Sequence, residues 1–312
     1  MLSVVVIGAG YMGRAHSRVV NELSLTYPIQ LSAIVDIDYE KAERVAKQYN
    51  AKAYSSVDDL DEYDVAIVAT TTSSHHIVVE KVADKVKYVF VEKPLADTIE
   101  HGRRIIEVCR EHNVQGMVGY IERFNPVVRT LLEVVRRGTL GDVISVIARR
   151  VGPYVPRIRD IGVVLDLATH DIDIAHLIYN SWPKSVYAQV EKVVNEVYED
   201  SAIIMLKFSD SKVAIIEANR ITPFKERKLI VTGTKAVAYL DYINQRLTIY
   251  THGWTMESNI QKEEPLKAEL RAFFESILRK DNMPIPLEDG LKLLEIGYMA
   301  LNSSKLSKPI QS

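Results

Sequence analysis

The chain of 312 residues has one cysteine, no long apolar run and no excess of charge of either sign. A single cysteine excludes an internal disulfide and any metal site built from several cysteines, and the apolar neighbours of Cys109 predict a buried, unreactive thiol. Because 39 basic residues stand against 41 acidic ones, the formal charge of −2 argues against binding of nucleic acid. No apolar run approaches the roughly 18 to 20 residues that cross a bilayer, so we expect a cytoplasmic protein without a membrane partner.

The residues present, 47% hydrophobic and 26% charged, are typical of a globular protein, and the length predicts two domains. The pattern changes near residue 120. Before that point, short β-branched runs alternate with amphipathic helical patterns, which predicts a doubly wound α/β domain with a parallel sheet over residues 1–120. After it, strand patterns separated by turn residues dominate, which predicts an α+β domain with a mostly antiparallel open sheet over residues 121–312.

The strands predicted for the first domain are Ser3 to Ile7, Leu31 to Val35, Val65 to Ala69, Tyr88 to Val91 and Gln115 to Val118. Its predicted helices are Met12 to Leu23, Glu40 to Tyr49, Ser74 to Val82 and Thr98 to His112. The second domain is predicted to have helices at 126–136, 163–179, 266–279 and 288–304, and strands at 143–150, 185–194, 202–208, 212–219, 227–231, 236–240 and 246–250. The C-terminal helix is a candidate for packing back on the first domain.

The first motif is a glycine-rich turn, Gly8-Ala9-Gly10-Tyr11-Met12-Gly13, directly after a predicted strand and at the start of a predicted helix. In this context Gly8 permits the tight turn, Gly10 lets the backbone approach a pyrophosphate, and Gly13 lets the helix pack closely on the strand. The turn therefore predicts a dinucleotide-binding Rossmann domain. The cofactor contacts that we expect in this turn are Gly8, Gly10, Tyr11, Met12 and Gly13.

An acidic residue ends the second predicted strand. Asp36 lies 36 − 13 = 23 residues after the last glycine, where a ligand of the adenosine ribose is expected. Its carboxylate would accept hydrogen bonds from the ribose hydroxyls and would repel a 2′-phosphate, and Ile37 rather than an arginine follows it. We therefore predict NAD rather than NADP, with Asp36 preferred to Asp38 as the ribose ligand.

Polar residues also follow two later strands of this domain. Thr70, Thr71 and His75 are expected to line the cofactor crevice at the carboxyl ends of the strands, although the hydroxyls would serve equally as helix caps. A metal site at His75 and His76 is disfavoured because no further ligand cluster follows in the sequence. The next predicted strand ends in Glu92-Lys93-Pro94. This motif places a lysine at the same edge of the sheet, in a position suited to catalysis rather than to solvation.

The second domain offers an acid–base pair. Asp166 and His170 are four residues apart in a predicted helix, so both project from one face, where the carboxylate would raise the basicity of the imidazole. A surface pair without function is the alternative. A metal site made of His170, Asp173 and His176 is disfavoured because the two histidines turn to different faces, so we expect no metal.

Four motifs in this order resemble the glucose-fructose oxidoreductase and inositol dehydrogenase (Gfo/Idh/MocA-type) family. They are the glycine turn, Glu92-Lys93-Pro94, Gly119-Tyr120 with Arg123-Phe124-Asn125-Pro126, and Asp166 with His170. The resemblance implies an NAD-dependent oxidoreductase that acts on CH–OH groups, with catalytic Lys93, Asp166 and His170 and with Glu92 at the cofactor. It also implies a homodimer or homotetramer formed through the sheet of the second domain.

Within the family, the segment from Arg150 to Asp173 resembles the UDP-N-acetylglucosamine 3-dehydrogenases, which oxidise the sugar C3 hydroxyl to a ketone. The substrate contacts expected on this basis are Tyr120, Arg123, Tyr154, Arg157, Asp166 and His170. Arg149, Arg150, Arg157 and Arg159 are candidates for binding a diphosphate, but each could equally be a solvated or ion-paired arginine. The alternative functions are a free-sugar or inositol dehydrogenase and a non-catalytic regulator that senses NAD.

The implied mechanism is direct hydride transfer to the nicotinamide. Lys93 would donate a hydrogen bond to the reacting hydroxyl, His170 would take its proton, and Asp166 would orient the imidazole. Lysine and histidine could exchange the role of base.

Overall fold

The computed structural model describes residues 1–154, 160–209 and 212–312. The chain divides into two compact units, one made of Met1–Tyr120 with Leu266–Leu294 and the other of Ile121–Pro265 with Glu295–Ser312. The division of the sequence into folding domains at residue 120 stays a prediction; the first compact unit also takes in a later segment of the chain.

The first unit contains a six-stranded parallel sheet in the order β3-β2-β1-β4-β5-β6. Its strands are β1 (Leu2–Ile7), β2 (Ile29–Val35), β3 (Lys52–Tyr54), β4 (Val65–Val68), β5 (Tyr88–Glu92) and β6 (Gln115–Gly119). Every residue of β4 is buried, as expected of a strand covered on both faces. The predicted doubly wound parallel sheet is confirmed, and the carboxyl ends of its strands meet at one edge.

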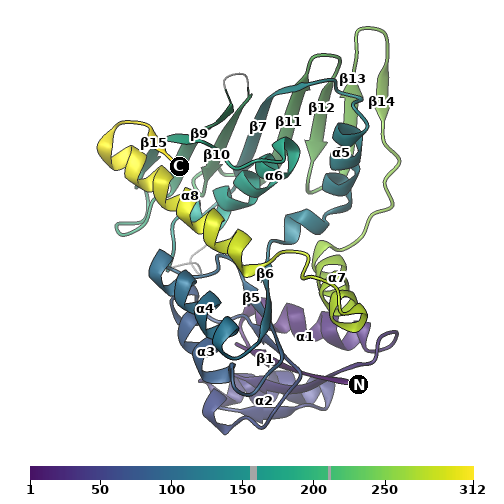
Figure 1. Ribbon diagram of the computed structural model, residues 1–312, viewed down its shortest axis with the longest axis vertical. Helices are drawn as coiled ribbons and strands as arrows, with labels where there is room; N and C mark the ends of the chain where they lie inside the picture. The colour runs from purple at the N-terminus through teal and green to yellow at the C-terminus, as the bar shows by residue number, and fades with distance from the viewer. Residues whose placement is uncertain (155–159, 210–211) are drawn as a thin grey trace. The chain divides into compact units, whose positions relative to one another are not determined.

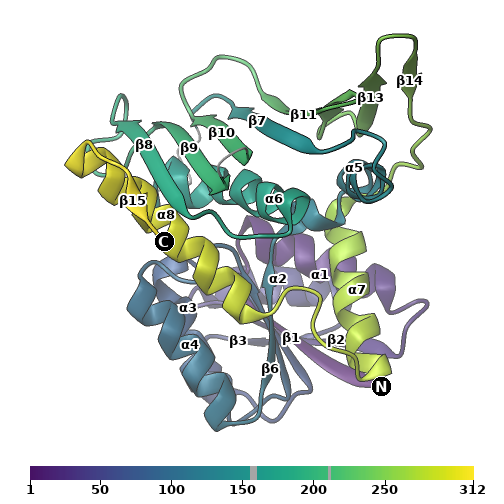
Figure 2. The same ribbon diagram turned by 45° about the horizontal axis from the view of Figure 1, so that its top comes forward.

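Helices cover both faces of this sheet. They are α1 (Tyr11–Leu23), α2 (Tyr39–Tyr49), α3 (His75–Val82), α4 (Ile99–Glu111), α7 (Pro265–Arg279) and the first part of α8 (Leu287–Leu306), with short 3-10 turns η1 (Val57–Asp59) and η2 (Thr72–Ser74). In two views α3 and α4 lie on one side of the strands and α1 and α7 on the other (Figures 1 and 2). The ring of Phe273 in α7 lies 5.5 Å from that of Phe90 in β5, which fixes α7 to the sheet.

The second unit contains a nine-stranded sheet in the order β14-β13-β12-β11-β7-β10-β9-β8-β15. Its strands are β7 (Val143–Val151), β8 (Ser185–Glu191), β9 (Ser201–Ser209), β10 (Lys212–Asn219), β11 (Glu226–Gly233), β12 (Val237–Asp241), β13 (Arg246–Tyr250), β14 (Thr255–Glu257) and β15 (Ile310–Gln311). Among the described strands of this second sheet, only β7 and β10 pair in parallel. The predicted mostly antiparallel sheet is confirmed.

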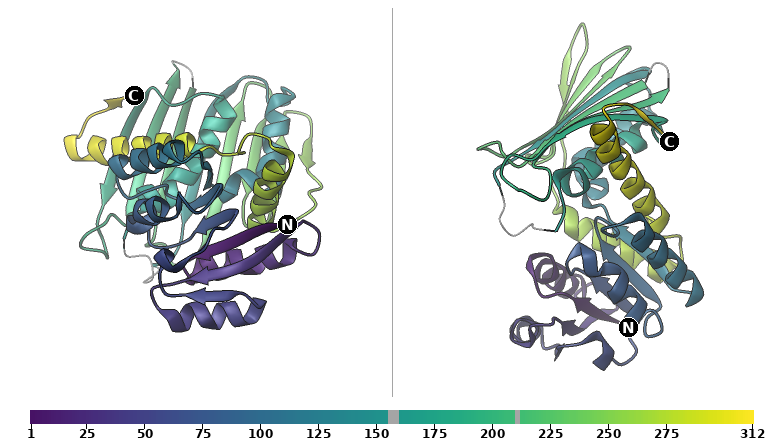
Figure 3. Two further views of the ribbon diagram at one scale, coloured as in Figure 1. Left: turned by 60° about the horizontal axis from the view of Figure 1, so that its bottom comes forward. Right: turned by 90° about the vertical axis from the view of Figure 1, so that its left-hand side faces the viewer.

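The helical segments of this unit are η3 (Ile121–Phe124), α5 (Pro126–Arg136), η4 (Val164–Ala168), α6 (Thr169–Tyr179) and the last part of α8. They lie against one face of the sheet, and the opposite face carries no helix of the described chain (Figure 3). Asn125 caps α5 by accepting a hydrogen bond from the backbone N–H of Val127. None of the helices in the described parts of the chain is long and apolar enough to cross a membrane.

The structure corrects some predicted elements. The strand predicted through Val194 ends at Glu191, because one carboxylate oxygen of Asp200 accepts the N–H groups of Val193, Val194 and Asn195 and bends this backbone into a turn. The single helix predicted over 163–179 begins with five residues of π-helix, η4, before α6. Three short strands, β3, β14 and β15, were not predicted, since two or three residues carry too little alternation to be recognised.

Candidate active site

The glycine turn of the first unit has the backbone that a pyrophosphate requires. Gly8 has φ +100°, and a Cβ atom there would lie 2.5 Å from the carbonyl oxygen of Ala69. A Cβ on Gly13 would lie 1.6 Å from the carbonyl oxygen of Gly8, whereas one on Gly10 would meet no atom within 4 Å. Gly10 is the N-cap of α1 and offers no side chain to the first N–H groups of the helix. The turn is therefore closed toward the sheet and open at the helix N-terminus, where an anion binds.

Asp36 joins the end of β2 to this turn. Its Oδ2 accepts the backbone N–H of Ala9 at 2.7 Å, and its Oδ1 accepts that of Asp38 at 2.9 Å. Each carboxylate oxygen keeps a second lone pair for a further donor. The half-buried carboxylate thus lies at the position predicted for a ribose ligand, while Asp38 caps α2 by accepting from the backbone of Lys41.

Thr70, Thr71 and His75 follow β4 at the same edge of the sheet. The Ser74 hydroxyl donates to Oγ1 of Thr70 at 2.9 Å, but neither Thr71 nor Ser74 caps with its side chain the helical segment that it precedes. His75 is buried, and its Nδ1 lies 3.3 Å from the carbonyl oxygen of Leu95. Burial lowers the pKa of this imidazole, which favours its neutral form.

The lysine motif is attached to α1 by a buried pair. Glu92, the last residue of β5, accepts a hydrogen bond from Nε2 of His16 at 2.7 Å and another from the backbone N–H of Lys93 at 3.2 Å. Burial alone would raise the pKa of the Glu92 carboxyl, but the bond with His16 and the charge of Lys93 outweigh burial and lower it. An ionised Glu92 therefore links the lysine loop to the helix that begins at the glycine turn. The sequence analysis missed His16, which lies 76 residues away within an ordinary amphipathic helix.

In the second unit, Asp166 lies in η4 and His170 in the first turn of α6, and both are 7% exposed. The guanidinium of Arg220, at the end of β10, binds Asp166 at 3.0 Å and also donates to the carbonyl oxygen of Ile161. Glu199 holds the start of the helix, since its carbonyl and carboxylate oxygens accept the N–H groups of Val163 and Val164. The sequence analysis missed Arg220 and Glu199, although a polar residue directly after a strand is a recognisable signal for the former.

Two more ion pairs hold α6. Arg150 of β7 is 1% exposed; it binds both carboxylate oxygens of Asp171, at 2.7 and 3.1 Å, and Oε1 of Glu122 at 2.8 Å. Burial lowers the pKa of Arg150, but Asp171 and Glu122 outweigh it and raise this pKa well above its ordinary value. Arg123 binds Asp173 through Nε at 2.8 and 3.0 Å. The acidic side chains of Asp166, Asp171 and Asp173 are thus each held by a different arginine.

These contacts change the interpretation of the predicted arginines. Arg150 follows the ion-paired alternative rather than the diphosphate one, because it is enclosed and binds two carboxylates. Arg149 points to the opposite face of the sheet and is paired with Glu217 at 2.8 Å and Glu226 at 2.7 Å. Arg157 and Arg159 lie outside the described residues. Arg123 is committed to Asp173, and its substrate contact stays a prediction, as do those of Tyr120, which is buried, and Tyr154, which is half-buried.

The histidines considered for metal binding have other neighbours in the structure. His176, which was considered with His170 and Asp173, stacks on Trp182 with ring centroids 3.6 Å apart. Among the described residues, one group of possible ligands comes together, His76, Asp97 and His101. The two imidazole rings stack 3.6 Å apart with planes 12° from parallel, so their nitrogen lone pairs do not converge on one ion as metal ligands do.

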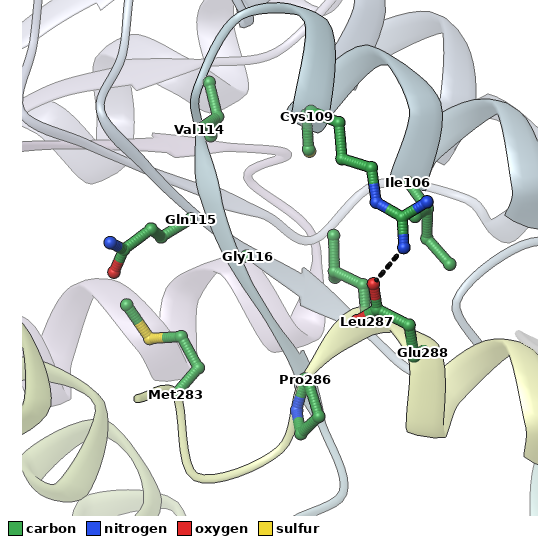
Figure 4. Close-up of a pocket in the computed structure, with 10 residues that line it drawn as sticks. Ile106, Cys109, Val114, Gln115, Gly116, Met283, Pro286, Leu287 and Glu288 are labelled. Atoms are coloured by element: carbon green, nitrogen blue, oxygen red, sulfur yellow. Dashed lines mark hydrogen bonds and ion pairs between the residues drawn. The ribbon is translucent and has the colours of Figure 1, made fainter. Parts of the chain in front are cut away.

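A hollow of about 200 Å³ lies between α4, β6 and the start of α8, and none of its lining residues is a predicted site residue (Figure 4). Its lining is mostly apolar, and an ion pair between Arg110 and Glu288, 2.8 Å apart, lies at one side. Burial raises the pKa of the Cys109 thiol in this lining to about 12, which agrees with the unreactive, buried cysteine predicted from the sequence.

Comparison with known proteins identifies both parts of the chain. Residues 2–120 match the model of the oxidoreductase family with an NAD-binding Rossmann fold, and residues 128–239 match that of the GFO/IDH/MocA C-terminal domain. The chain belongs to the GFO/IDH/MocA oxidoreductase family. Its members confirm the predicted class: the protein is an NAD-dependent oxidoreductase that acts on CH–OH groups.

Relatives in this family act on different substrates. UDP-N-acetylglucosamine 3-dehydrogenase of Acidithiobacillus ferrooxidans is 28% identical over 283 residues, which cover 87% of each chain. Myo-inositol 2-dehydrogenase of Thermotoga maritima is 25% identical over 329 residues, 98% of this chain and 97% of the relative. A solved structure of the Acidithiobacillus enzyme has a TM-score of 0.88 at 26% identity and covers 98% of both chains.

The first prediction concerns Asp36. We expect the protein to bind NAD more tightly than NADP, and Asp36→Ala to narrow the ratio of the two dissociation constants, because the carboxylate no longer binds the ribose hydroxyls or repels a 2′-phosphate. Asp38→Ala is the matched control and should leave the ratio unchanged. Titration of both cofactors measures this, and equal affinities in the unmutated protein would remove Asp36 from the cofactor site.

The second prediction compares adjacent arginines. Arg150→Met should lower the free energy of unfolding by about 3 to 5 kcal/mol, because two buried carboxylates lose their partner. Arg149→Met breaks only half-exposed pairs and should cost about 1 kcal/mol or less. Urea denaturation of both variants checks this, and equal losses would show that Arg150 does not hold the second unit together.

Proposed function

We propose that this oxidoreductase oxidises the C3 hydroxyl of UDP-N-acetylglucosamine, with NAD as oxidant, to the 3-keto sugar. The name of the relative that shares 28% identity with this chain supports the substrate. The observation that carries the chemistry is the buried start of α6, where His170 lies one turn after Asp166, whose carboxylate is paired with Arg220. A buried imidazole near a carboxylate is suited to accept a proton.

The proposed roles follow from the chemistry of a secondary alcohol. Oxidation removes a hydride from the carbinol carbon and a proton from its oxygen, which leaves a ketone. NAD, when bound at the glycine turn, supplies the hydride acceptor, its nicotinamide C4. His170 takes the proton, Lys93 donates a hydrogen bond that stabilises the developing alkoxide, and Asp166 stabilises the imidazolium that forms. The assignment of Lys93 rests on its motif and on its attachment through Glu92.

The second candidate function is oxidation of a free inositol or sugar. The myo-inositol 2-dehydrogenase that matches 98% of this chain favours it. The two candidates differ in one requirement, since only a nucleotide-sugar enzyme has to recognise a nucleoside diphosphate. Binding of UDP therefore separates them.

We also propose that copies of the chain associate through the bare face of the nine-stranded sheet. Paired residues of neighbouring strands form an apolar row there, with Tyr187, Met205, Ile147 and Tyr239 each more than 40% exposed. A contiguous exposed row of this kind is typical of a protein interface. A monomeric mass in light scattering at micromolar concentration would contradict this association.

A substrate panel tests the proposed reaction. The protein is incubated with NAD and with UDP-N-acetylglucosamine, other nucleotide sugars, free sugars or inositols, and NADH is followed at 340 nm. We expect turnover of UDP-N-acetylglucosamine at a higher kcat/KM than any free sugar or inositol. Preference for an inositol without binding of UDP would establish the second candidate instead.

The catalytic prediction uses the same assay. Lys93→Met and His170→Ala should each lower kcat by about 10²-fold or more, as loss of a positioned acid–base group does, and should leave the affinity for NAD nearly unchanged. Activity of the unmutated enzyme should fall at acid pH because a protonated imidazole cannot accept the hydroxyl proton. This acidic limb should be missing from the residual activity of His170→Ala. A fully active Lys93→Met would refute the proposed site.

A further inference from the structure

Strand β11 carries charges on both faces of the sheet, and the two faces differ in how these charges are paired. On the bare face, Glu226 binds Arg149 at 2.7 Å and Lys228 binds Asp241 at 2.7 Å. Successive residues of a strand point to opposite faces, so Arg227 belongs to the other, helix-covered side, and Lys225 directly precedes the strand. On that side the positively charged side chains outnumber the carboxylates that neutralise them.

Arg227 lies directly opposite Arg150 on the neighbouring strand. Like charges in this position repel each other, and a carboxylate must offset them. Asp171 gives both of its oxygens to Arg150, and Arg227 reaches only Oε1 of Glu122, at 3.5 Å, the same oxygen that Arg150 binds at 2.8 Å. Arg227 therefore shares one carboxylate oxygen with a closer and fully buried guanidinium.

Lys225 adds a third positive charge to this place. Its ammonium forms no ion pair with the described residues, its side chain is exposed, and its Cγ lies beside Gly152 at the end of β7. The charge of Arg227, followed by burial, lowers the pKa of Lys225, and burial, followed by the charge of Arg150, lowers the pKa of Arg227. Both groups would thus be stabilised by an anion brought from outside the chain.

The two cations lie near the helix that carries the proposed catalytic groups. Arg227 shares Glu122 with Arg150, and Arg150 in turn binds Asp171 in the first turn of α6. Arg227 is about one-third exposed in its side chain, so its guanidinium is accessible to a ligand from the same side as Lys225. A planar guanidinium and a flexible ammonium together suit two linked phosphate groups.

We propose that Lys225 and Arg227 bind the diphosphate of the nucleotide-sugar substrate. This inference rests on the proposed function, and it names the residues that select a nucleotide sugar over a free sugar. The phosphate ligands are then Lys225 and Arg227 rather than the arginines of β7, because those arginines are already paired with carboxylates. The sugar then extends toward His170, while the diphosphate stays at the end of β11.

Isothermal titration of the full-length protein with UDP tests the inference. Saturating NAD is present throughout, so that the probe cannot bind at the glycine turn, and inorganic pyrophosphate is titrated in parallel. Lys225→Ala and Arg227→Gln should each weaken UDP binding about 10-fold or more, as loss of a charge-assisted hydrogen bond does. Lys225→Arg should retain most of the affinity. Lys228→Ala, on the same strand but paired on the opposite face, is the matched control and should bind UDP as the unmutated protein does.

Steady-state kinetics give the second readout. KM for UDP-N-acetylglucosamine should rise in Lys225→Ala and Arg227→Gln, with kcat changed by less than about threefold, because the interaction is made equally in the ground state and the transition state. If Arg227→Gln does not fold, which loss of its circular-dichroism signal would show, the variants of the exposed Lys225 test the inference alone.

The outcomes separate this inference from the proposed function. An unmutated protein that turns over UDP-N-acetylglucosamine while Lys225→Ala and Arg227→Gln keep its KM and UDP affinity would overturn the inference alone. An unmutated protein that binds no UDP and oxidises an inositol would overturn both.

Discussion

The enclosed guanidinium of Arg150 is the contact on which the candidate site of the second unit depends. An arginine without access to water is stable only when carboxylates surround it, and Arg150 takes one from η3 and one from α6. Tyr242 completes the arrangement: its hydroxyl donates to Asp171 at 3.1 Å, and its ring lies 4.9 Å from the guanidinium. Strand β7, the turn after β6 and the start of α6 are therefore tied at a single buried point.

The consequence for function is a helix whose orientation is fixed before any ligand arrives. Asp166, Asp171 and Asp173 are bound by arginines from three different elements, so α6 can neither rotate nor slide without breaking a buried ion pair. His170 lies among these three residues in the sequence. Rigid supports of this kind keep a catalytic group within the narrow range of positions and angles that proton transfer requires.

The sequence predicted the features that depend on local pattern. Runs such as Val65 to Ala69 are apolar on both faces, and this alone indicates a buried parallel strand. The glycine turn and Asp36 could be assigned because their chemistry depends on spacing along the chain. Contacts between distant residues could not be predicted in this way. His16 and Glu92 are 76 residues apart, and Arg220 and Asp166 are 54 apart, with no periodicity that relates them.

Arg150 shows where a prediction of this kind fails and what would have improved it. Alternation along β7 gives it the same face as Val146 and Ala148, which are buried, whereas Arg149 shares the exposed face of Ile147. Alternation thus predicts that Arg150 is enclosed, but not which carboxylates enclose it. Those come from elements on either side in the sequence, and only the folded chain brings them to one guanidinium.

The five π-helical residues of η4 make the start of α6 depend on chain length as well as on residue type. A π-turn holds one residue more than the α-helical turn it replaces. Deleting one residue between Val164 and Ala168 would let an ordinary α-helical turn replace the π-turn, and the parts of the chain before and after it would keep nearly the same orientation, because the wider turn holds the extra residue. Asp171 and Asp173 would keep their arginines, but Asp166, which lies inside the segment, would change its direction relative to His170 and Arg220. The extra residue thus sets the direction of Asp166 within the helix, and the length of the segment is as much a part of the site as the identity of its side chains.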